Sequence, residues 1–102
     1  VAGVAFLAVN STQPLIEDVA FMRSMIPHHS IAINNARKAA ISDPRVRDLA
    51  DEIISSQVRE IAEMKLLIDD IEANGERGRD PLAARPAVVT QDMLPQIEAA
   101  VR

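Results

Sequence analysis

Two adjacent histidines, His28 and His29, stand in a segment where apolar residues recur at helical spacing. On a helix with about 100° between residues, His29 shares one narrow stripe with Met22 and Met25. Asp18 falls on the same stripe about one turn earlier, and His28 lies on its flank. Imidazole, thioether and carboxylate groups are metal-binding side chains, so this helix face is a candidate ligand surface.

A second set of side chains that could do chemistry lies further along the chain. Gln57, Glu60 and Met64 fall on the apolar stripe of a second helical segment. Burying an amide or a carboxylate within an apolar face costs several kcal/mol unless each group finds a partner. These side chains therefore indicate either polar partners on a facing helix or a bound ion.

The two sets come together if the chain reverses at Ser42-Asp43. Counting outward from that reversal predicts three facing pairs, which are His29 with Gln57, Met25 with Glu60, and Met22 with Met64. Because each residue advances a helix by about 1.5 Å, these pairs fall within roughly 10 Å along the axis. The spacing thus predicts one cluster of imidazole, thioether and carboxylate groups between two antiparallel helices.

The mixture of ligand types indicates which ion the cluster would prefer. Thioether with imidazole suits copper, whereas carboxylate with imidazole also suits zinc. We therefore predict a metal site with copper as the first candidate and zinc as the alternative. The predicted ligands are Met25, His28, His29, Glu60 and Met64, and the weaker candidates are Met22, Gln57 and Asp18.

An alternative interpretation needs no metal. Methionines on a helix face are usually core filler, because the flexible thioether fits irregular gaps. His29, Glu60 and Gln57 would then form a buried hydrogen-bond network that sets the register of a structural helical dimer. Both interpretations place the same side chains between the same two helices.

Residues typical of helix ends indicate where the helices that carry these groups begin and stop. Three helices are predicted, over residues 15–41, 44–73 and 93–101. Asp43 is the expected N-cap of the second helix, Pro44 suits its first turn, and Gly75 follows its end. Asp92 is the expected cap of the last helix. Because the first connection is short, the two long helices must be antiparallel neighbours.

The predicted fold class is therefore all-α, a long antiparallel helical hairpin followed by a loop and a short C-terminal helix. We divide the chain into an apolar N-terminal segment (residues 1–14), the hairpin with the metal site (15–75), and the loop with the last helix (76–102). Val1–Val9 is too short to cross a bilayer, which takes about 20 residues. It is either the remnant of a signal or membrane anchor upstream of Val1, or an ordinary buried segment.

Composition excludes several classes of function. The formal net charge of −4 leaves no basic face to neutralise phosphates, so no nucleic-acid partner is expected. No cysteine is present, which excludes disulfides, thiolate zinc sites and cysteine nucleophiles. The only aromatic residues are Phe6 and Phe21, so the core must be aliphatic and rich in alanine.

The order of these residues resembles domain-of-unknown-function family 305, which includes the CopM-type copper-binding metallochaperones. The resemblance spans about Asp18 to Ile71 and rests on Met25-Ile26-Pro27-His28-His29, Asp43-Pro44, Gln57, Glu60-Ile61 and Met64. It implies a ferritin-like helical bundle that is exported from the cytoplasm. It also implies copper handling by Met and His, with signature residues at Met25, His28, His29, Gln57, Glu60 and Met64.

The chain departs from the family pattern in its number of methionines and of hairpins. Asn35 stands where members often have methionine, a methionine-rich tail is missing, and one hairpin is present where many members have two. One hairpin leaves apolar surface uncovered, so we predict a homodimer that completes a four-helix bundle. The Leu82–Val89 arm is the alternative cover for part of that surface.

These expectations combine into a non-enzymatic, metal-binding helical protein. We expect it to act outside the cytoplasm, secreted, periplasmic or membrane-anchored, as a metal carrier or buffer. A ferritin-like oxidase is disfavoured because the paired Glu-x-x-His motifs are missing. Asp18 and Glu60 are also too few carboxylates for a di-metal centre within one chain.

Overall fold

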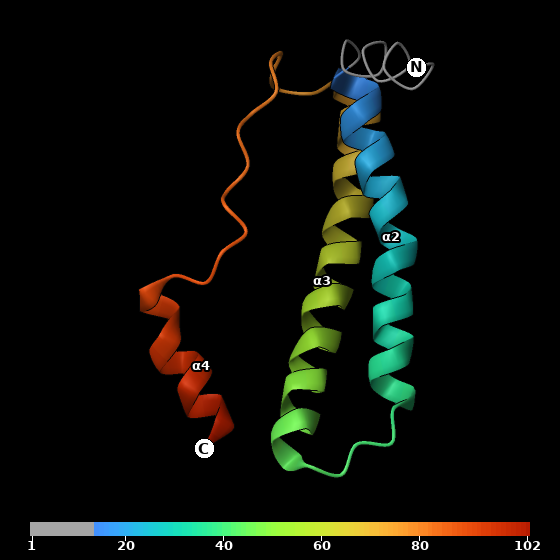
Figure 1. Ribbon diagram of the computed structural model, residues 1–102. Helices are drawn as coiled ribbons and strands as arrows, with labels where there is room; N and C mark the ends of the chain where they lie inside the picture. The colour runs from blue at the N-terminus through green and yellow to red at the C-terminus, as the bar shows by residue number, and fades with distance from the viewer. Residues whose placement is uncertain (1–13) are drawn as a thin grey trace, which may run out of the picture.

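Three helices and one short turn of 3₁₀ helix make up the described chain. The computed structural model describes residues 14–102, with side chains from Glu17 onward. Its elements are α2 (Pro14–Lys38), α3 (Pro44–Asn74), η1 (Gln91–Met93) and α4 (Leu94–Val101) (Figure 1). These residues contain no strand, so the predicted all-α hairpin is confirmed. The apolar run Val1–Val9 lies outside the described residues.

Local sequence signals determine both ends of α3. The Asp43 carboxylate accepts a hydrogen bond from the Arg45 backbone N–H at 2.9 Å, and Pro44 occupies the first turn. At the other end Gly75 has a backbone φ of +84°, a conformation that residues with a Cβ atom rarely adopt. Its N–H donates to the Ile71 carbonyl oxygen at 2.7 Å. The predicted cap and stop of this helix are thus confirmed.

One predicted helix end and one predicted cap were wrong. The first helix ends at Lys38 rather than Ile41, so residues 39–43 connect the two long helices. Asp43 is held extended, as expected for the residue before a proline, and the chain must leave the helical path before it. Asp92 does not cap α4, because it lies inside η1, where its carboxylate accepts a hydrogen bond from the Thr90 hydroxyl.

The core is a narrow seam between α2 and α3, which run antiparallel side by side (Figure 1). Buried and partly buried apolar side chains from both helices fill it: Val19, Met22, Met25, Ile26, Ile61, Met64, Ile68 and Ile71. No side chain in the described part of the chain is completely buried. One helix packed on one other helix can cover only a stripe of each partner.

Four apolar residues that recur at helical spacing along α3 are exposed rather than buried. Val46, Leu49, Ile53 and Leu67 keep between 38% and 56% of their surface open to solvent. The apolar stripe of α3 is wider than the surface that α2 covers, because a helix inside a globular fold usually packs against more than one neighbour. Periodicity places these residues on one apolar face, and a single hairpin covers only part of that face.

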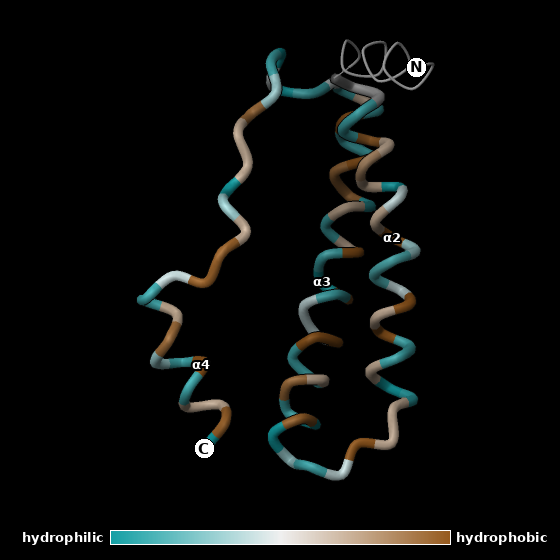
Figure 2. Tube along the Cα trace, viewed as in Figure 1, coloured by the Kyte–Doolittle hydropathy of each residue, from teal (hydrophilic) through white to brown (hydrophobic). Residues whose placement is uncertain are grey.

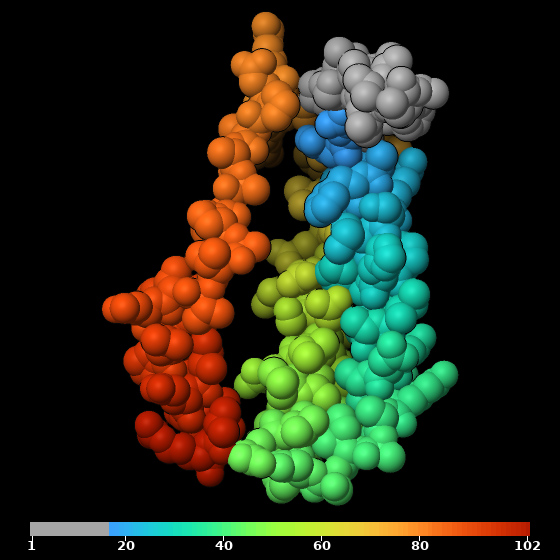
Figure 3. Space-filling view, in the orientation of Figure 1, coloured from blue at the N-terminus to red at the C-terminus, as the bar shows by residue number. Residues whose placement is uncertain are grey.

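The chain after Gly75 stands away from the hairpin. Residues 75–90 form an extended arm, and α4 lies beside the turn end of α3 with open space between them (Figures 1 and 3). The Arg45 guanidinium donates to the Val101 carbonyl oxygen at 2.5 Å. Apolar residues follow the arm and α4 (Figure 2), and Leu82 is 95% exposed. Only the start of the arm, residues 75–82, borders a groove with the open end of the hairpin, and the rest of the arm does not cover it.

The resulting surface is large for the mass of the chain. The chain exposes 8536 Å², whereas a globular monomer of 11.1 kDa exposes about 5,700 Å². Its radius of gyration is 17.9 Å, compared with about 13 Å for a compact domain of this length. No helix among residues 14–102 is long and apolar enough to cross a bilayer.

Candidate functional site

A histidine and a glutamate join the two helices near the middle of the hairpin. His29 Nε2 on α2 lies 2.6 Å from Glu60 Oε1 on α3. The imidazole is mostly buried, with 11% of its side chain exposed, while the Glu60 side chain is 39% exposed. The pair thus has one side within the helical seam and one side that solvent can reach.

The backbone of α2 orients the imidazole. His29 Nδ1 lies 2.9 Å from the Met25 carbonyl oxygen, which can only accept a hydrogen bond. Nδ1 therefore carries a proton, and Nε2 is the nitrogen directed at the Glu60 carboxylate. A hydrogen bond from Nδ1 to a backbone carbonyl is the outer contact that metal-binding histidines commonly make. The Glu60 carboxylate can also only accept, so Nε2–H donates in this contact, and a metal ion at Nε2 would take the place of that proton.

Glu60 is held as a carboxylate by its neighbours. The Ser56 hydroxyl donates to Oε2 at 3.1 Å, and the Arg59 guanidinium lies 3.7 Å from the same oxygen. The hydrogen bond from His29, followed by that from Ser56, holds the pKa of the Glu60 carboxyl below its usual range. A charged carboxylate next to an imidazole nitrogen can bind either a proton or a metal cation.

The register of this contact differs from the predicted one by about one helical turn. His29 was expected level with Gln57, but its partner is Glu60. Helical side chains lean toward the N-terminus of their own helix. In an antiparallel pair, His29 therefore leans away from the turn while α3 side chains lean toward it. This inclination brings a more distant residue of α3 into contact, and Gln57 remains half-buried beside the pair.

Three of the four methionines gather next to the pair. Met22 and Met64 are buried in the core, and Met25 packs against the same cluster. Met25 precedes His29 by one turn of α2, and Met64 follows Glu60 by one turn of α3. Thioether side chains thus occupy the same seam within one or two helical turns of the imidazole and the carboxylate. The fourth methionine, Met93, lies in η1 after the arm.

Two of the predicted ligands are separate from this cluster. His28 is exposed on the flank of α2, and its side chain makes no hydrogen bond within the described part of the chain. Asp18 is exposed near the open end of the hairpin, where it borders a groove shared with Asp70 and Arg77. Among residues 17–102, no three His, Asp or Glu side chains converge on one point. One chain therefore brings together one imidazole and one carboxylate.

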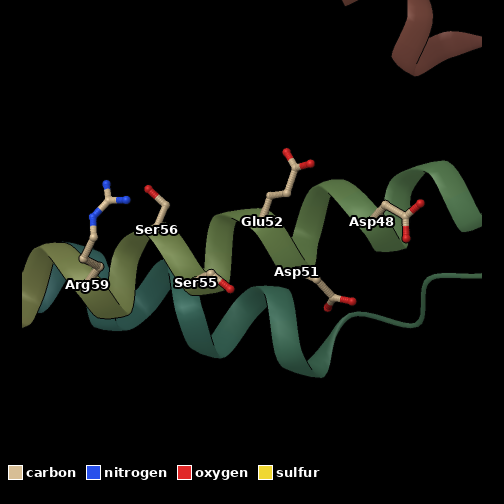
Figure 4. A pocket seen from close by; sticks show the side chains of 6 residues that line it. All are labelled: Asp48, Asp51, Glu52, Ser55, Ser56 and Arg59. Carbon is tan, nitrogen blue, oxygen red and sulfur yellow. The ribbon is translucent and has the colours of Figure 1, made fainter. Parts of the chain in front are cut away.

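The outer side of α3 carries a group of polar residues. Asp48, Asp51, Glu52, Ser55, Ser56 and Arg59 line a shallow concavity there (Figure 4). Ser56 links this surface to the candidate site through its contact with Glu60. The sequence analysis missed Ser56, although its place one turn before Glu60 puts its hydroxyl within reach.

Comparisons with known proteins give a family and one viral relative. The sequence model of the family described as "Domain of unknown function (DUF305)" matches residues 17–99. "Uncharacterized protein L153" of Acanthamoeba polyphaga mimivirus is 43% identical over 61 residues. That match covers 58% of this chain and 40% of the relative, so the chain spans less than half of the relative's length. No solved structure is a significant match.

Proposed function

Because the chain belongs to the DUF305 family, whose description assigns no activity, we propose a function from the chemistry of its site. The protein is a non-enzymatic metal-binding helical protein, a carrier or buffer that acts outside the cytoplasm. The single observation that supports this proposal is the His29–Glu60 pair, in which Nε2 faces a carboxylate oxygen at 2.6 Å. The extracytoplasmic setting rests on the family resemblance alone.

The donor set is compatible with a soft or borderline cation. His29 Nε2 would supply the imidazole ligand, and the Glu60 carboxylate would supply an oxygen or orient the ring. Met25 and Met64 would supply thioether sulfur from the adjoining cluster. Thioether and imidazole favour copper, and the carboxylate makes zinc the alternative. His28 is a more distant candidate, because its exposed ring must turn from the flank of α2.

The metal-free alternative has one observation in its favour. The His29–Glu60 contact is already a direct hydrogen bond, and Met25 and Ser56 complete the partners of both groups. A satisfied polar pair between two apolar helices can specify their register without an ion. Under this alternative the chain is a structural helical dimer with a half-buried His–Glu network.

Enzymatic activity of the ferritin-like oxidase type has less support. A di-metal oxidase needs several carboxylates and two histidines around one centre. Within the described chain, Glu60 is the carboxylate that contacts an imidazole. We therefore retain the non-enzymatic proposal.

A titration of metal-free protein tests the proposal. Cu(I), Cu(II) and Zn(II) would each be competed against a chelator, using the wild type, His29→Ala and Met64→Ala. Matched controls are His28→Ala, an exposed histidine beside His29, and Met93→Ala, a methionine outside the cluster. We expect at least about a tenfold loss of copper affinity in the first two variants and no change in Met93→Ala. His28→Ala reports whether the flanking ring joins the site.

Two outcomes would count against the proposal. Unchanged affinity in both His29→Ala and Met64→Ala would place any metal site elsewhere. An ion that binds only the native state must raise the midpoint of thermal unfolding. If saturating copper and zinc both leave that midpoint unchanged, the structural alternative is supported instead.

A further inference from the structure

The two sides of the hairpin differ in chemistry. On one side the Arg23 guanidinium bridges the helices to Glu72 at 2.6 Å. Arg47 and Lys65 share that flank of α3 with Glu72, because they are separated by near-whole numbers of helical turns. We call these four residues the charged face. The Arg47 guanidinium also donates to the Ala36 carbonyl oxygen at 2.9 Å, which closes this side near the turn.

The opposite side is mainly apolar. On α3 its members follow one another at intervals of four or seven residues, so they share the other flank of the buried stripe. The apolar face consists of Phe21 from α2 and Leu49, Ile53, Glu60, Leu67 and Ile71 from α3. Phe21 is 63% exposed, Leu49 56% and Leu67 51%. Glu60 is the polar exception, and it belongs to the candidate site.

The α3 residues of the apolar face are arranged symmetrically about Glu60. Ile53 and Leu67 lie seven residues before and after it, and Leu49 and Ile71 lie eleven residues before and after it. Such an arrangement is self-complementary. A two-fold axis at the level of Glu60 would place Leu49 of one copy against Ile71 of the other, and Ile53 against Leu67.

We infer that a second copy of this chain packs on the apolar face about this axis. An isologous two-fold interface uses the same patch on both copies, which is what a palindromic row of side chains offers. The α3 helices would be antiparallel across the axis, and the two hairpins would form four helices in all. The resulting layer would cover the exposed part of the apolar stripe of α3.

The whole chain exposes more surface than a standard interface requires. The chain exposes 8536 Å², about 2,800 Å² more than a globular monomer of its mass. Part of this excess lies on the arm and α4. A standard interface needs only about 800 Å² from each partner. α4 stands off from the hairpin (Figure 3), while arm residues 76–82 border a groove with Leu67 and Ile71. Phe21, Leu49 and Ile53 are exposed, and Ile71 is half-buried because it also packs against the core.

The inferred axis also changes the composition of the candidate site, a consequence that rests on the proposed function. The exposed side of each Glu60 lies on the interface, so two His29–Glu60 pairs approach each other at the axis. One chain supplies one imidazole and one carboxylate, whereas the pair supplies two of each. A complete ligand set then belongs to the dimer, with one ion bound per two chains.

Sedimentation equilibrium of the metal-free chain tests the interface without reference to any ion. We expect the wild type to be a dimer. Leu49→Glu should raise the dimer dissociation constant by about 30-fold or more, because it places a charge in the apolar contact with Ile71 of the other copy. Val58→Glu is the matched control, since Val58 is 52% exposed on the other side of α3. Circular dichroism verifies that both variants remain helical, and Leu67→Glu with Leu66→Glu repeats the comparison if Leu49→Glu does not fold.

Introduced cysteines test the register, because the chain has none of its own. The double variant Ile53→Cys/Leu67→Cys should form a disulfide-linked dimer in mild oxidant, while Val58→Cys should not. These two positions are about 21 Å apart along one helix, so the link must join two chains. A monomeric wild type, or equal effects of Leu49→Glu and Val58→Glu, would overturn the interface. Dimers that do not crosslink would overturn the axis at Glu60.

Copper stoichiometry separates the failure of this inference from that of the proposed function. One ion per two chains supports the shared site. One ion per chain overturns the shared site while the metal-binding proposal stands. No binding overturns the metal-binding proposal and the shared site, and the sedimentation result then decides the interface by itself.

Discussion

The charged face and the apolar face of the hairpin cover the same core in different ways. The charged face is held by Arg23–Glu72, whose side chains are 59% and 49% exposed. The apolar face carries the His29–Glu60 pair, in which the imidazole is only 11% exposed. Exposed ion pairs contribute little to stability because solvent screens them. The charged face is therefore typical of a solvent-exposed surface, and the apolar face is typical of a protein interface.

The difference between the two faces shows why the half-buried His29–Glu60 pair matters more for stability than an exposed ion pair. A polar group in an apolar surface is costly without a partner, so Glu60 must be bonded on each side that is covered. Its bonds to His29 and Ser56 meet this requirement within one chain. Arg23 and Glu72 face no such requirement, because water solvates them. A substitution at the pair should therefore matter more than one at the charged face.

The largest effect is expected in the core beneath both faces. Met64→Ala should lower the free energy of unfolding by about 2–4 kcal/mol, through lost burial and the cavity left behind. Leu66→Ala is the neighbouring control, because Leu66 is 70% exposed. Urea unfolding at one fixed chain concentration measures both. An equal loss in the two variants would show that the seam is not the core.

The direct comparison of the faces is expected to give a smaller effect. His29→Ala should lower the free energy of unfolding of the metal-free protein by about 1–3 kcal/mol, since it removes a mostly buried hydrogen-bonded ring. Arg23→Ala should cost less than about 1 kcal/mol. High salt should reduce the cost of Arg23→Ala more than that of His29→Ala. Similar costs and similar salt dependence for the two variants would contradict the distinction between the faces.

The smallest effect is expected from acid. The pKa of Glu60 is lowered by its hydrogen bond from His29, so its contribution to stability is fully present above the usual carboxyl pKa of about 4.3. That contribution is lost as the pH falls through the lowered pKa. The urea midpoint of metal-free protein should fall on acidification below this range. Glu60→Gln should flatten the profile, and an unchanged profile in this variant would contradict the assignment.

The sequence predicts most accurately the features that depend on neighbouring residues. Asp43, Pro44 and Gly75 are recognisable because a cap, a first-turn proline and a left-handed stop each involve only a few residues. The hairpin and the convergence of His29 with Glu60 follow from periodicity and one short connection. These signals suffice for the fold class and for the centre of the candidate site.

Other features depend on geometry that the sequence does not state. The register shift from Gln57 to Glu60 comes from the inclination of side chains along antiparallel helices. The exposure of Leu49 and Leu67 depends on how many helices pack against α3. The spacing of apolar residues along one helix does not give that number. His28 was expected near the site, but a helix turns adjacent residues about 100° apart, and only one can enter the seam. Ser56 was missed because a serine on a helix does not by itself indicate a contact with a functional side chain.

The separation of the tail from the hairpin has a consequence for unfolding. Arg45 joins the turn end of α3 to the last carbonyl of α4 through one exposed hydrogen bond, and the intervening arm buries little apolar surface. Losing that bond would leave Val19, Met22, Met64 and Ile68 in their places. We therefore expect the tail and the hairpin to unfold as separate units, so that amide hydrogen exchange in α4 follows local opening rather than global denaturation.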